Sequence, residues 1–173
     1  MKFTVRKLIQ KDLPQLVELL NKTLDEAFIH YQKRTRQAYK RLSDIKYYTR
    51  VLKRKTSIAL GAFAKGKILG FISLESKDGG VGLVEWFIVD KSYRGKGLGT
   101  ALMARLEKEA ISKYYHHIFL YTETKKNIEF YKRRGFEYVG LQKKSWFGED
   151  EHMMQKILRD KPFHEMFERY LRE

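Results

Sequence analysis

A basic, glycine-rich turn between an apolar segment and an amphipathic helix limits the folds open to this chain more than any other feature. Residues 81–89 have the apolar character of a strand, residues 90–96 form a loop, and residues 97–112 form a helix with leucine at every fourth position. A short strand follows at residues 117–121. Two strands joined through a helix pair in parallel, with a right-handed crossover. This unit therefore predicts an α/β fold.

Strand and helix patterns on both sides of this unit complete a predicted order of β-α-α-β-β-β-α-β-α-β-β-α. Ser43 is the expected N-cap of the second of two helical pieces within residues 24–55. The strands before the turn form an antiparallel meander, so we expect a mixed, mostly antiparallel sheet flanked by helices. The remaining predicted segments are strand 3–8, helix 12–20, strands 57–64 and 68–73, helix 126–134, and strands 137–141 and 152–158.

The 173 residues suit one domain with one core, and no linker or internal repeat divides them. We expect a single domain over residues 1–158. Residues 159–173 are expected to form an amphipathic helix that packs on the domain or at an oligomer interface, in a monomer or a homodimer. Its apolar stripe consists of Phe163, Met166, Phe167, Tyr170 and Leu171.

Charge and cysteine content narrow the function classes. The chain has no cysteine, which excludes disulfides, thiolate metal sites and a cysteine nucleophile. His116 and His117 would point to opposite faces of a strand, so no metal site is expected. The net charge of +15 attracts phosphate groups. No stretch approaches the ~18 apolar residues of a membrane span, so we expect a cytoplasmic protein without membrane contact.

The turn from Tyr93 to Thr100 has the properties of an anion-binding cradle. Glycines let the backbone approach a ligand, and the following helix N-terminus offers unpaired N–H groups and a positive dipole end. A Walker loop is excluded because no Gly-Lys pair is followed by Ser or Thr. A dinucleotide fingerprint fits poorly, since Thr100 occupies the position of its third glycine.

Two motifs in this order resemble the GNAT acetyltransferase superfamily. The segment Arg94-x-x-Gly97-x-Gly99 matches the family's Gln/Arg-x-x-Gly-x-Gly/Ala pyrophosphate loop. Residues 127–136, Asn-Ile-Glu-Phe-Tyr-Lys-Arg-Arg-Gly-Phe, resemble its later helix motif, Asn-x-x-Ala-x-x-Phe-Tyr-x-x-x-Gly-Phe. Lys91 and Ser92 stand where the family often has proline. The predicted element order agrees with the family from about residue 1 to residue 158.

The resemblance implies an N-acetyltransferase, an acyltransferase that moves an acetyl group from acetyl-CoA to a primary amine within a ternary complex. It also implies a sheet whose central strands splay apart, and a pantetheine arm that pairs with the backbone at the end of strand 81–89. Acetyl-CoA is the expected co-substrate, and no metal is expected. The residues implied in binding it are Phe87, Ile88, Val89, Arg94, Gly95, Lys96, Gly97, Leu98, Gly99, Thr100, Asn127 and Tyr131.

Two side chains are candidates for the proton transfers of this reaction. By resemblance, Tyr131 is the general acid that protonates the leaving sulfur, and Asn127, four residues earlier, lies on the same helix face. Glu85 is the candidate base and shares a strand face with Phe87 and Val89. Glu75, Glu123 and Tyr121 are rivals because they too lie near strand ends.

Two features bear on the acceptor. The aromatic pair Trp146 and Phe147, followed by Gly-Glu-Asp, resembles a stretch of protein N-terminal acetyltransferases, so a protein N-terminal or lysine amine is favoured slightly over a small-molecule amine. The segment Lys33–Lys55 contains ten basic residues and one acidic residue. It is either a solvated helical surface or a surface that recruits an acidic peptide, RNA or a phosphorylated metabolite.

Two other functions remain open at this point. The charge alone would fit a nucleic-acid-binding module, although the sequence contains no helix-turn-helix, zinc or aromatic RNA-platform signature. A GNAT-like domain could also sense acetyl-CoA without catalysis. The presence of Tyr131, Asn127 and Glu85 favours catalysis over sensing.

Overall fold

The computed structural model describes residues 1–159, so the helix expected for residues 159–173 lies almost entirely outside the described residues. Two compact units divide the chain. The N-terminal unit comprises Met1–Leu74 and Trp86–Leu106, and the C-terminal unit comprises Glu75–Glu85 and, of the described residues, 107–159.

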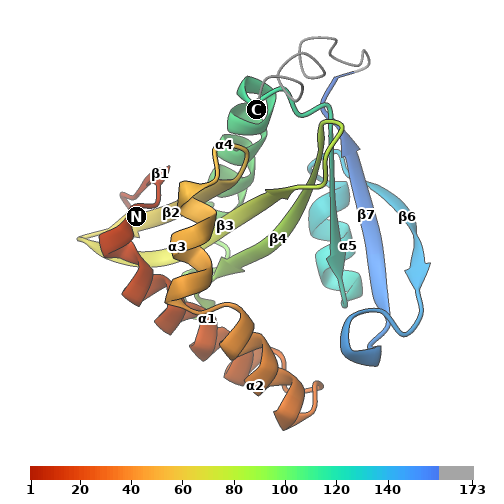
Figure 1. Cartoon of the computed structure of the whole chain (residues 1–173), viewed down its shortest axis with the longest axis horizontal. Coiled ribbons are helices and arrows are strands. Elements are labelled where there is room, and N and C mark those ends of the chain that lie inside the picture. Colours follow the sequence, from red (N-terminus) through yellow and green to blue (C-terminus); the bar gives the residue numbers. More distant parts are fainter. Residues whose placement is uncertain (160–173) are drawn as a thin grey trace. The chain divides into compact units, whose positions relative to one another are not determined.

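The order of helices and strands agrees with the prediction for the described residues, except that three helices and not two lie between β1 and β2 (Figure 1). The seven strands follow the order β1-β2-β3-β4-β5-β7-β6, with a parallel β4–β5 pair and antiparallel β1–β2, β2–β3, β5–β7 and β6–β7 pairs. This confirms the expectation of an α/β fold with a mixed, mostly antiparallel sheet. The bounds are β1 (Thr4–Lys7), α1 (Leu13–Ala27), α2 (Lys33–Leu42), α3 (Ile45–Lys53), β2 (Ile58–Ala64), β3 (Lys67–Ser76), β4 (Val81–Val89), α4 (Leu98–Ser112), β5 (His117–Thr122), α5 (Lys125–Lys132), β6 (Glu137–Gln142) and β7 (Glu151–Ile157).

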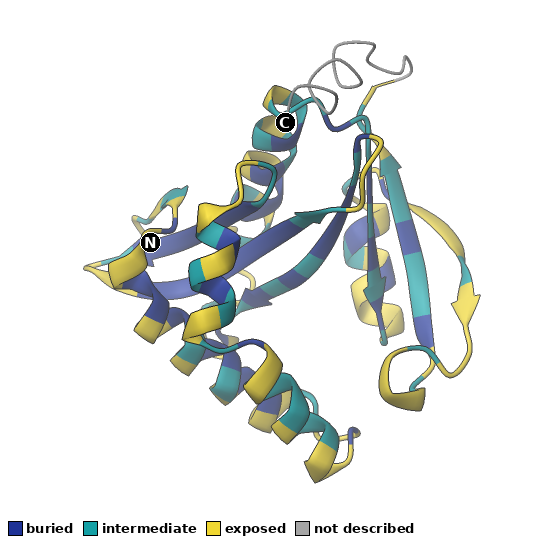
Figure 2. Ribbon diagram, viewed as in Figure 1, coloured by how far each residue is buried: buried dark blue, intermediate teal, exposed yellow. Residues whose placement is uncertain are grey.

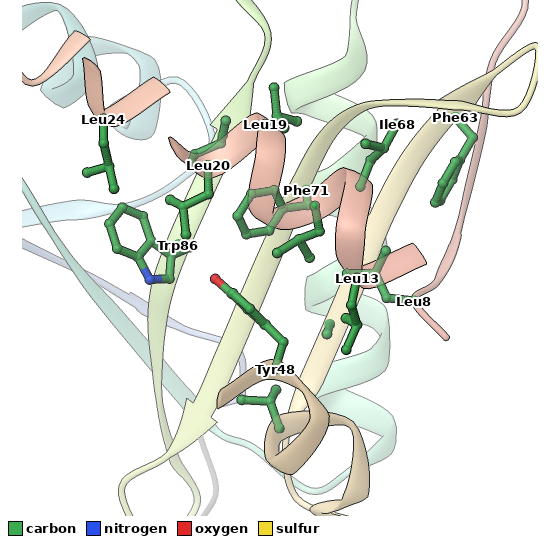
Figure 3. Packing of buried hydrophobic residues seen from close by; sticks show 14 residues of the cluster. Leu8, Leu13, Leu19, Leu20, Leu24, Tyr48, Phe63, Ile68, Phe71 and Trp86 are labelled. Atoms are coloured by element: carbon green, nitrogen blue, oxygen red, sulfur yellow. The ribbon is translucent and has the colours of Figure 1, made fainter. Parts of the chain in front are cut away.

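The N-terminal unit is built on a core between its strands and the helices α1 and α3 (Figure 3). Strands β2 and β3 are buried over nearly their whole length, because helices cover both of their faces. Each fully buried leucine of α1 contributes about 1.5–3 kcal/mol to folding. The α1 side of this core contains Leu13, Leu16, Leu19, Leu20 and Leu24.

Helix boundaries in this unit differ from the prediction in two places. Helix α1 continues to Ala27, because the apolar spacing extends through Leu24. The N-cap of α3 is Asp44 and not Ser43: the Asp44 carboxylate accepts a 2.8 Å hydrogen bond from the backbone N–H of Tyr47. Ser43 instead ends α2, where its own N–H donates to the Tyr39 carbonyl.

The C-terminal unit contains the first residues of β4 together with β5, β7, β6 and α5. The parallel ladder covers Val81–Leu83 of β4 and His117–Phe119 of β5, which confirms the predicted parallel strand–helix–strand unit. Strand β6 is the last in the strand order and is mostly exposed, as is the loop that joins it to β7 (Figure 2). This loop carries the aromatic pair predicted to meet the acceptor.

A close approach between β3 and β4 precedes the glycine-rich turn. A methyl group placed on Gly70 of β3 would come within 2.7 Å of the Ile88 carbonyl oxygen and 3.3 Å of the Val89 Cα. It would also meet Leu102 of α4 at 3.3 Å. The absence of a side chain at Gly70 therefore lets the end of β4 and helix α4 both approach β3 this closely before the turn.

Candidate active site

Asp90 fixes the point at which β4 becomes the glycine-rich turn. Its backbone N–H donates to the Leu69 carbonyl at 2.9 Å, and its carboxylate accepts from the Ser92 N–H at 2.9 Å and from the Lys22 ammonium at 2.9 Å. Burial by itself would raise the pKa of Asp90, but the hydrogen bonds from Lys22 and Ser92 outweigh it and hold that pKa below its usual value. Asp90 is thus a charged anchor for the turn.

The turn itself exposes its backbone. Gly95 and Gly97 have φ values of +74° and +83°, in the left-handed region that favours glycine, and a Cβ placed on either would meet no atom within 4 Å. The backbone ladder of α4 begins with the bond from Ala101 N–H to the Gly97 carbonyl at 3.0 Å. The N–H groups of Leu98 and Gly99 therefore precede the ladder, as the predicted anion cradle requires.

The two basic side chains of the turn fold back onto their own backbone. Arg94 Nε donates to the Val89 carbonyl at 3.2 Å. Lys96 Nζ donates to the Ser92 carbonyl at 3.0 Å and lies 5.0 Å from the centre of the Tyr93 ring. These contacts hold the cationic groups against the backbone of residues 89–93, and their charge keeps the potential over the turn positive.

Strand β4 presents alternating faces. Glu85, Phe87 and Val89 are half-buried on one face, whereas Trp86 and Ile88 are buried in the N-terminal core on the other. This alternation matches the predicted shared face of Glu85, Phe87 and Val89. Glu85 belongs to the C-terminal unit, whereas the rest of β4, from Trp86 to Val89, belongs to the N-terminal unit.

Tyr131 is buried on α5 of the C-terminal unit. Its ring lies 5.3 Å from that of Phe130 and 5.6 Å from that of Phe136, measured between centroids. Burial, and then the negative charge of Glu123, raise the pKa of the Tyr131 phenol well above its usual value, and Arg134 only partly opposes them. The hydroxyl therefore keeps its proton throughout the physiological pH range, as a general acid must.

Asn127 lies at the start of α5, one turn before Tyr131. Its amide Nδ2 donates to the Thr122 hydroxyl at 3.0 Å, and its backbone N–H donates to the Thr124 hydroxyl at 3.2 Å. Thr124 is the N-cap of the helix. Asn127 thus ties the end of β5 to the first turn of α5, and its side chain is exposed.

The loop between β6 and β7 displays two large aromatic rings. Trp146 is 57% exposed and Phe147 is 47% exposed. Phe147 has a φ of +56°, which a non-glycine residue adopts only at a cost in free energy. Backbone bonds from Ser145 to Glu149, at 2.7 Å, and from Gly148 to Ser145, at 3.0 Å, close the turn. The rings are held outward by a defined turn.

The two units divide the predicted site residues between them. The N-terminal unit holds Phe87, Ile88 and Val89 with the whole turn from Arg94 to Thr100, and the C-terminal unit holds Glu85, Asn127, Tyr131, Trp146 and Phe147. Sequence reasoning missed three charged residues that the structure ties to these groups: Lys22, Asp90 and Glu151. No sequence motif marks Lys22 or Glu151. The partner of Lys22 lies 68 positions later in the sequence, and the partners of Glu151 lie in the irregular loop before β7.

Within residues 1–159, no group of three or more histidine or acidic side chains could hold a metal ion. In the same part of the chain, every helix is too short or too polar to cross a membrane.

Known proteins resemble this chain in sequence and in fold. The model of the acetyltransferase (GNAT) family matches residues 13–136, which span the turn and the α5 motif. An uncharacterized N-acetyltransferase of Methanocaldococcus jannaschii is 28% identical over 145 residues, which are 78% of this chain and 61% of that protein. This chain therefore spans less than two thirds of that relative.

Solved structures share the fold. The PaiA N-acetyltransferase of Thermoplasma acidophilum, solved in complex with coenzyme A, superposes with a TM-score of 0.77 at 23% identity over 91% of this chain and 99% of that chain. The ribosomal-protein-alanine N-acetyltransferase of Brucella melitensis has a TM-score of 0.74 at 25% identity, over 89% and 99% of the two chains. The resemblance noted in the sequence is thereby confirmed, and the chain belongs to the acetyltransferase (GNAT) family.

Proposed function

We propose that this protein is an N-acetyltransferase that moves an acetyl group from acetyl-CoA directly to a primary amine. The observation that carries the proposal is the exposed turn at Gly95 and Gly97, whose positive φ values place the N–H groups of Leu98 and Gly99 at the start of α4. Such a turn fits the pyrophosphate of coenzyme A, which demands close backbone approach and several N–H donors. Arg94 and Lys96 add positive charge beside it.

Acetyl-CoA supplies a thioester, an acyl group that an amine can take without further activation. Tyr131 holds its proton on Oη and donates it to the sulfur as the carbon–sulfur bond breaks. Glu85 accepts, directly or through water, the proton that the amine loses as its nitrogen bonds to the acetyl carbon. At neutral pH only about one lysine-like amine in a few thousand is unprotonated. A base such as Glu85 is therefore needed for an appreciable rate of acetyl transfer.

The favoured acceptor is a protein N-terminal or lysine amine. Trp146 and Phe147 support this choice, because exposed rings on a closed turn offer a wall for the side chains of a peptide. The relative from Brucella melitensis carries the name ribosomal-protein-alanine N-acetyltransferase, in keeping with a protein acceptor. Small amines are the second candidate class.

Thiol release from acetyl-CoA, measured against a panel of peptides, polyamines and amino sugars, tests the proposal. We expect turnover with at least one peptide whose N-terminal or lysine amine is free. Tight acetyl-CoA binding without thiol release on any amine would instead indicate a sensor. Salt-sensitive RNA binding without acetyl-CoA affinity would indicate a nucleic-acid-binding module.

The same assay tests the base. Glu85→Gln should slow turnover more at pH 7 than at pH 10, because the acceptor amine is already neutral at high pH and needs no base. Glu75→Gln, on the preceding strand, is the matched control and should leave the pH profile unchanged. A Glu85→Gln profile that parallels wild type would place the base elsewhere, with Glu75, Glu123 and Tyr121 as the next candidates.

A further inference from the structure

Glu151 is a buried carboxylate that the proposed chemistry does not use. It is the first residue of β7 and is 6% exposed. Its carboxylate accepts hydrogen bonds from the Ser145 side chain and the Trp146 backbone N–H. Its Oε2 atom is shielded from solvent and has no hydrogen-bond partner among the residues that the structure describes.

This arrangement costs folding free energy. A buried carboxylate oxygen without a donor keeps its desolvation penalty uncompensated. Burial raises the pKa of Glu151, the negative charges of Glu123 and Glu149 add to the rise, and the Ser145 and Trp146 hydrogen bonds oppose it. Burial, and then the negative charge of Glu151, also raise the pKa of the Tyr121 phenol on β5. A glutamine would make the same two hydrogen bonds without the charge.

The negative charge of Glu151 lies next to the turn that displays Trp146 and Phe147. The hydrogen bonds from Ser145 and Trp146 place the carboxylate directly behind the turn that displays Trp146 and Phe147. Glu123, at the end of β5, acts on Glu151 with the same sign. In a low-dielectric interior a negative charge reaches farther than in water, and ring faces attract cations as well. Lys143 and Lys144, on the other side of the turn, are exposed and therefore screened.

We propose that Glu151 makes the surface of Trp146 and Phe147 selective for acceptors that carry positive charge next to the reacting amine. This inference rests on the proposed function, and it assigns the acceptor a chemical class: a cationic peptide or an oligoamine. It predicts the opposite preference from recruitment of an acidic acceptor by Lys33–Lys55. Glu151 determines specificity in two ways. Its negative charge lowers the electrostatic potential at the turn, and its hydrogen bonds with Ser145 and Trp146 fix the conformation of the turn.

The test uses three peptides that differ only in the residue after the N-terminal amine: lysine, norleucine or glutamate. Both kcat/KM and calorimetric binding to the protein with coenzyme A present are measured. The kcat/KM of wild type should be about tenfold or more higher for the lysine peptide than for the glutamate peptide. A preference of this size lies within the Coulomb energy of charges several ångströms apart. Glu151→Gln should reduce this ratio to near one, through KM and not kcat, with the KM for acetyl-CoA unchanged.

Glu149→Gln is the matched control, because Glu149 lies in the same loop but is only half-buried. It should retain most of the lysine preference. Equal affinity of wild type for the three peptides, or an unchanged ratio in Glu151→Gln, would overturn the inference. Binding in the expected order without thiol release would instead contradict the proposed acetyl transfer and leave the charge selectivity standing.

Stability separates this role from a structural one. Because the pKa of Glu151 is raised in the folded protein, its protonated form stabilises the fold, and this stabilisation is lost as pH rises through the folded pKa. Glu151→Gln should therefore keep or raise Tm at pH 8 relative to wild type, with a smaller difference at pH 4.5. A lower Tm at pH 8, together with equal loss of activity on all three peptides, would show that Glu151 serves only to hold the turn.

Discussion

Lys22 on α1 and Asp90 at the end of β4 form an ion pair of 2.9 Å, although 68 residues separate them in the sequence. Asp90 caps the short turn before the glycines by accepting from the Ser92 N–H. The pair therefore connects the first helix to the start of the cradle that we propose for acetyl-CoA. The carboxylate is nearly buried, so its partner matters more than in an ordinary surface pair.

Replacing Lys22 by methionine should weaken acetyl-CoA binding. Without the ammonium, Asp90 keeps its burial but loses a hydrogen bond, and the turn loses one of its anchors. We expect KM for acetyl-CoA to rise about three- to tenfold with kcat little changed. Lys40→Met, which breaks the exposed pair with Asp25, is the control and should leave KM unaltered. Equal KM values for the two variants would mean that the pair does not position the turn.

Replacing Gly97 by glutamate should remove most acetyl-CoA affinity. The new side chain enters open space at a φ of +83° and brings a negative charge to the proposed pyrophosphate site. We expect affinity to fall at least tenfold, or about 1.4 kcal/mol, by calorimetry. Gly79→Glu, at a φ of +53° in an equally open turn, is the control and should leave acetyl-CoA affinity unchanged. If both variants bind acetyl-CoA equally well, the cradle assignment is wrong.

Replacing Tyr131 by phenylalanine should slow chemistry and spare binding. The ring keeps its packing against Phe130 and Phe136, but the proton on Oη is gone. We expect kcat to fall roughly 10²-fold with KM for acetyl-CoA within about twofold of wild type. Because the pKa of this phenol is raised, wild type should show no loss of kcat from Tyr131 ionisation up to pH 10. Tyr138→Phe, which removes an exposed hydroxyl bound to His152, is the control.

The Arg6–Asp12 pair should make stability depend on acidity. Asp12 accepts from Arg6 at 2.6 and 2.9 Å and from the Ile9 N–H at 2.9 Å, and the Arg6 hydrogen bonds hold its pKa below the usual value. A lowered folded pKa stabilises the protein above the unfolded pKa of about 3.9, and this stabilisation is lost as pH falls through the folded pKa.

Asp12→Asn should therefore lower the free energy of unfolding by about 1–2 kcal/mol at pH 7, a modest figure because Arg6 is 41% exposed. The difference from wild type should shrink below about pH 3. Asp25→Asn removes a largely exposed carboxylate and should change little. Urea unfolding at both pH values measures the effect, and an equal deficit at both would exclude the ion pair as its cause.

The sequence by itself determined the helices, the strands and the glycine-rich turn between β4 and α4. Strand periodicity ending at Val89, glycines at 95 and 97 and a leucine-spaced helix are local signals, and local signals are sufficient to predict a strand, a turn and a helix N-terminus. The positive φ values of Gly95 and Gly97 follow the same logic, since glycine adopts them at no steric cost. The Ser43 N-cap was wrong because two adjacent residues could cap, and the end of α2 decided between them.

Only the tertiary structure decided which charges meet. Lys22 lies four residues from both Glu18 and Glu26 on α1, so helix spacing points to these acids and not to Asp90, which the sequence presents as an ordinary turn residue. Glu151 falls at a strand start, where a carboxylate is ordinarily solvated, yet the fold buries it behind Trp146 and leaves one oxygen without a donor. Burial and long-range pairing depend on how distant segments pack, and no residue spacing records that.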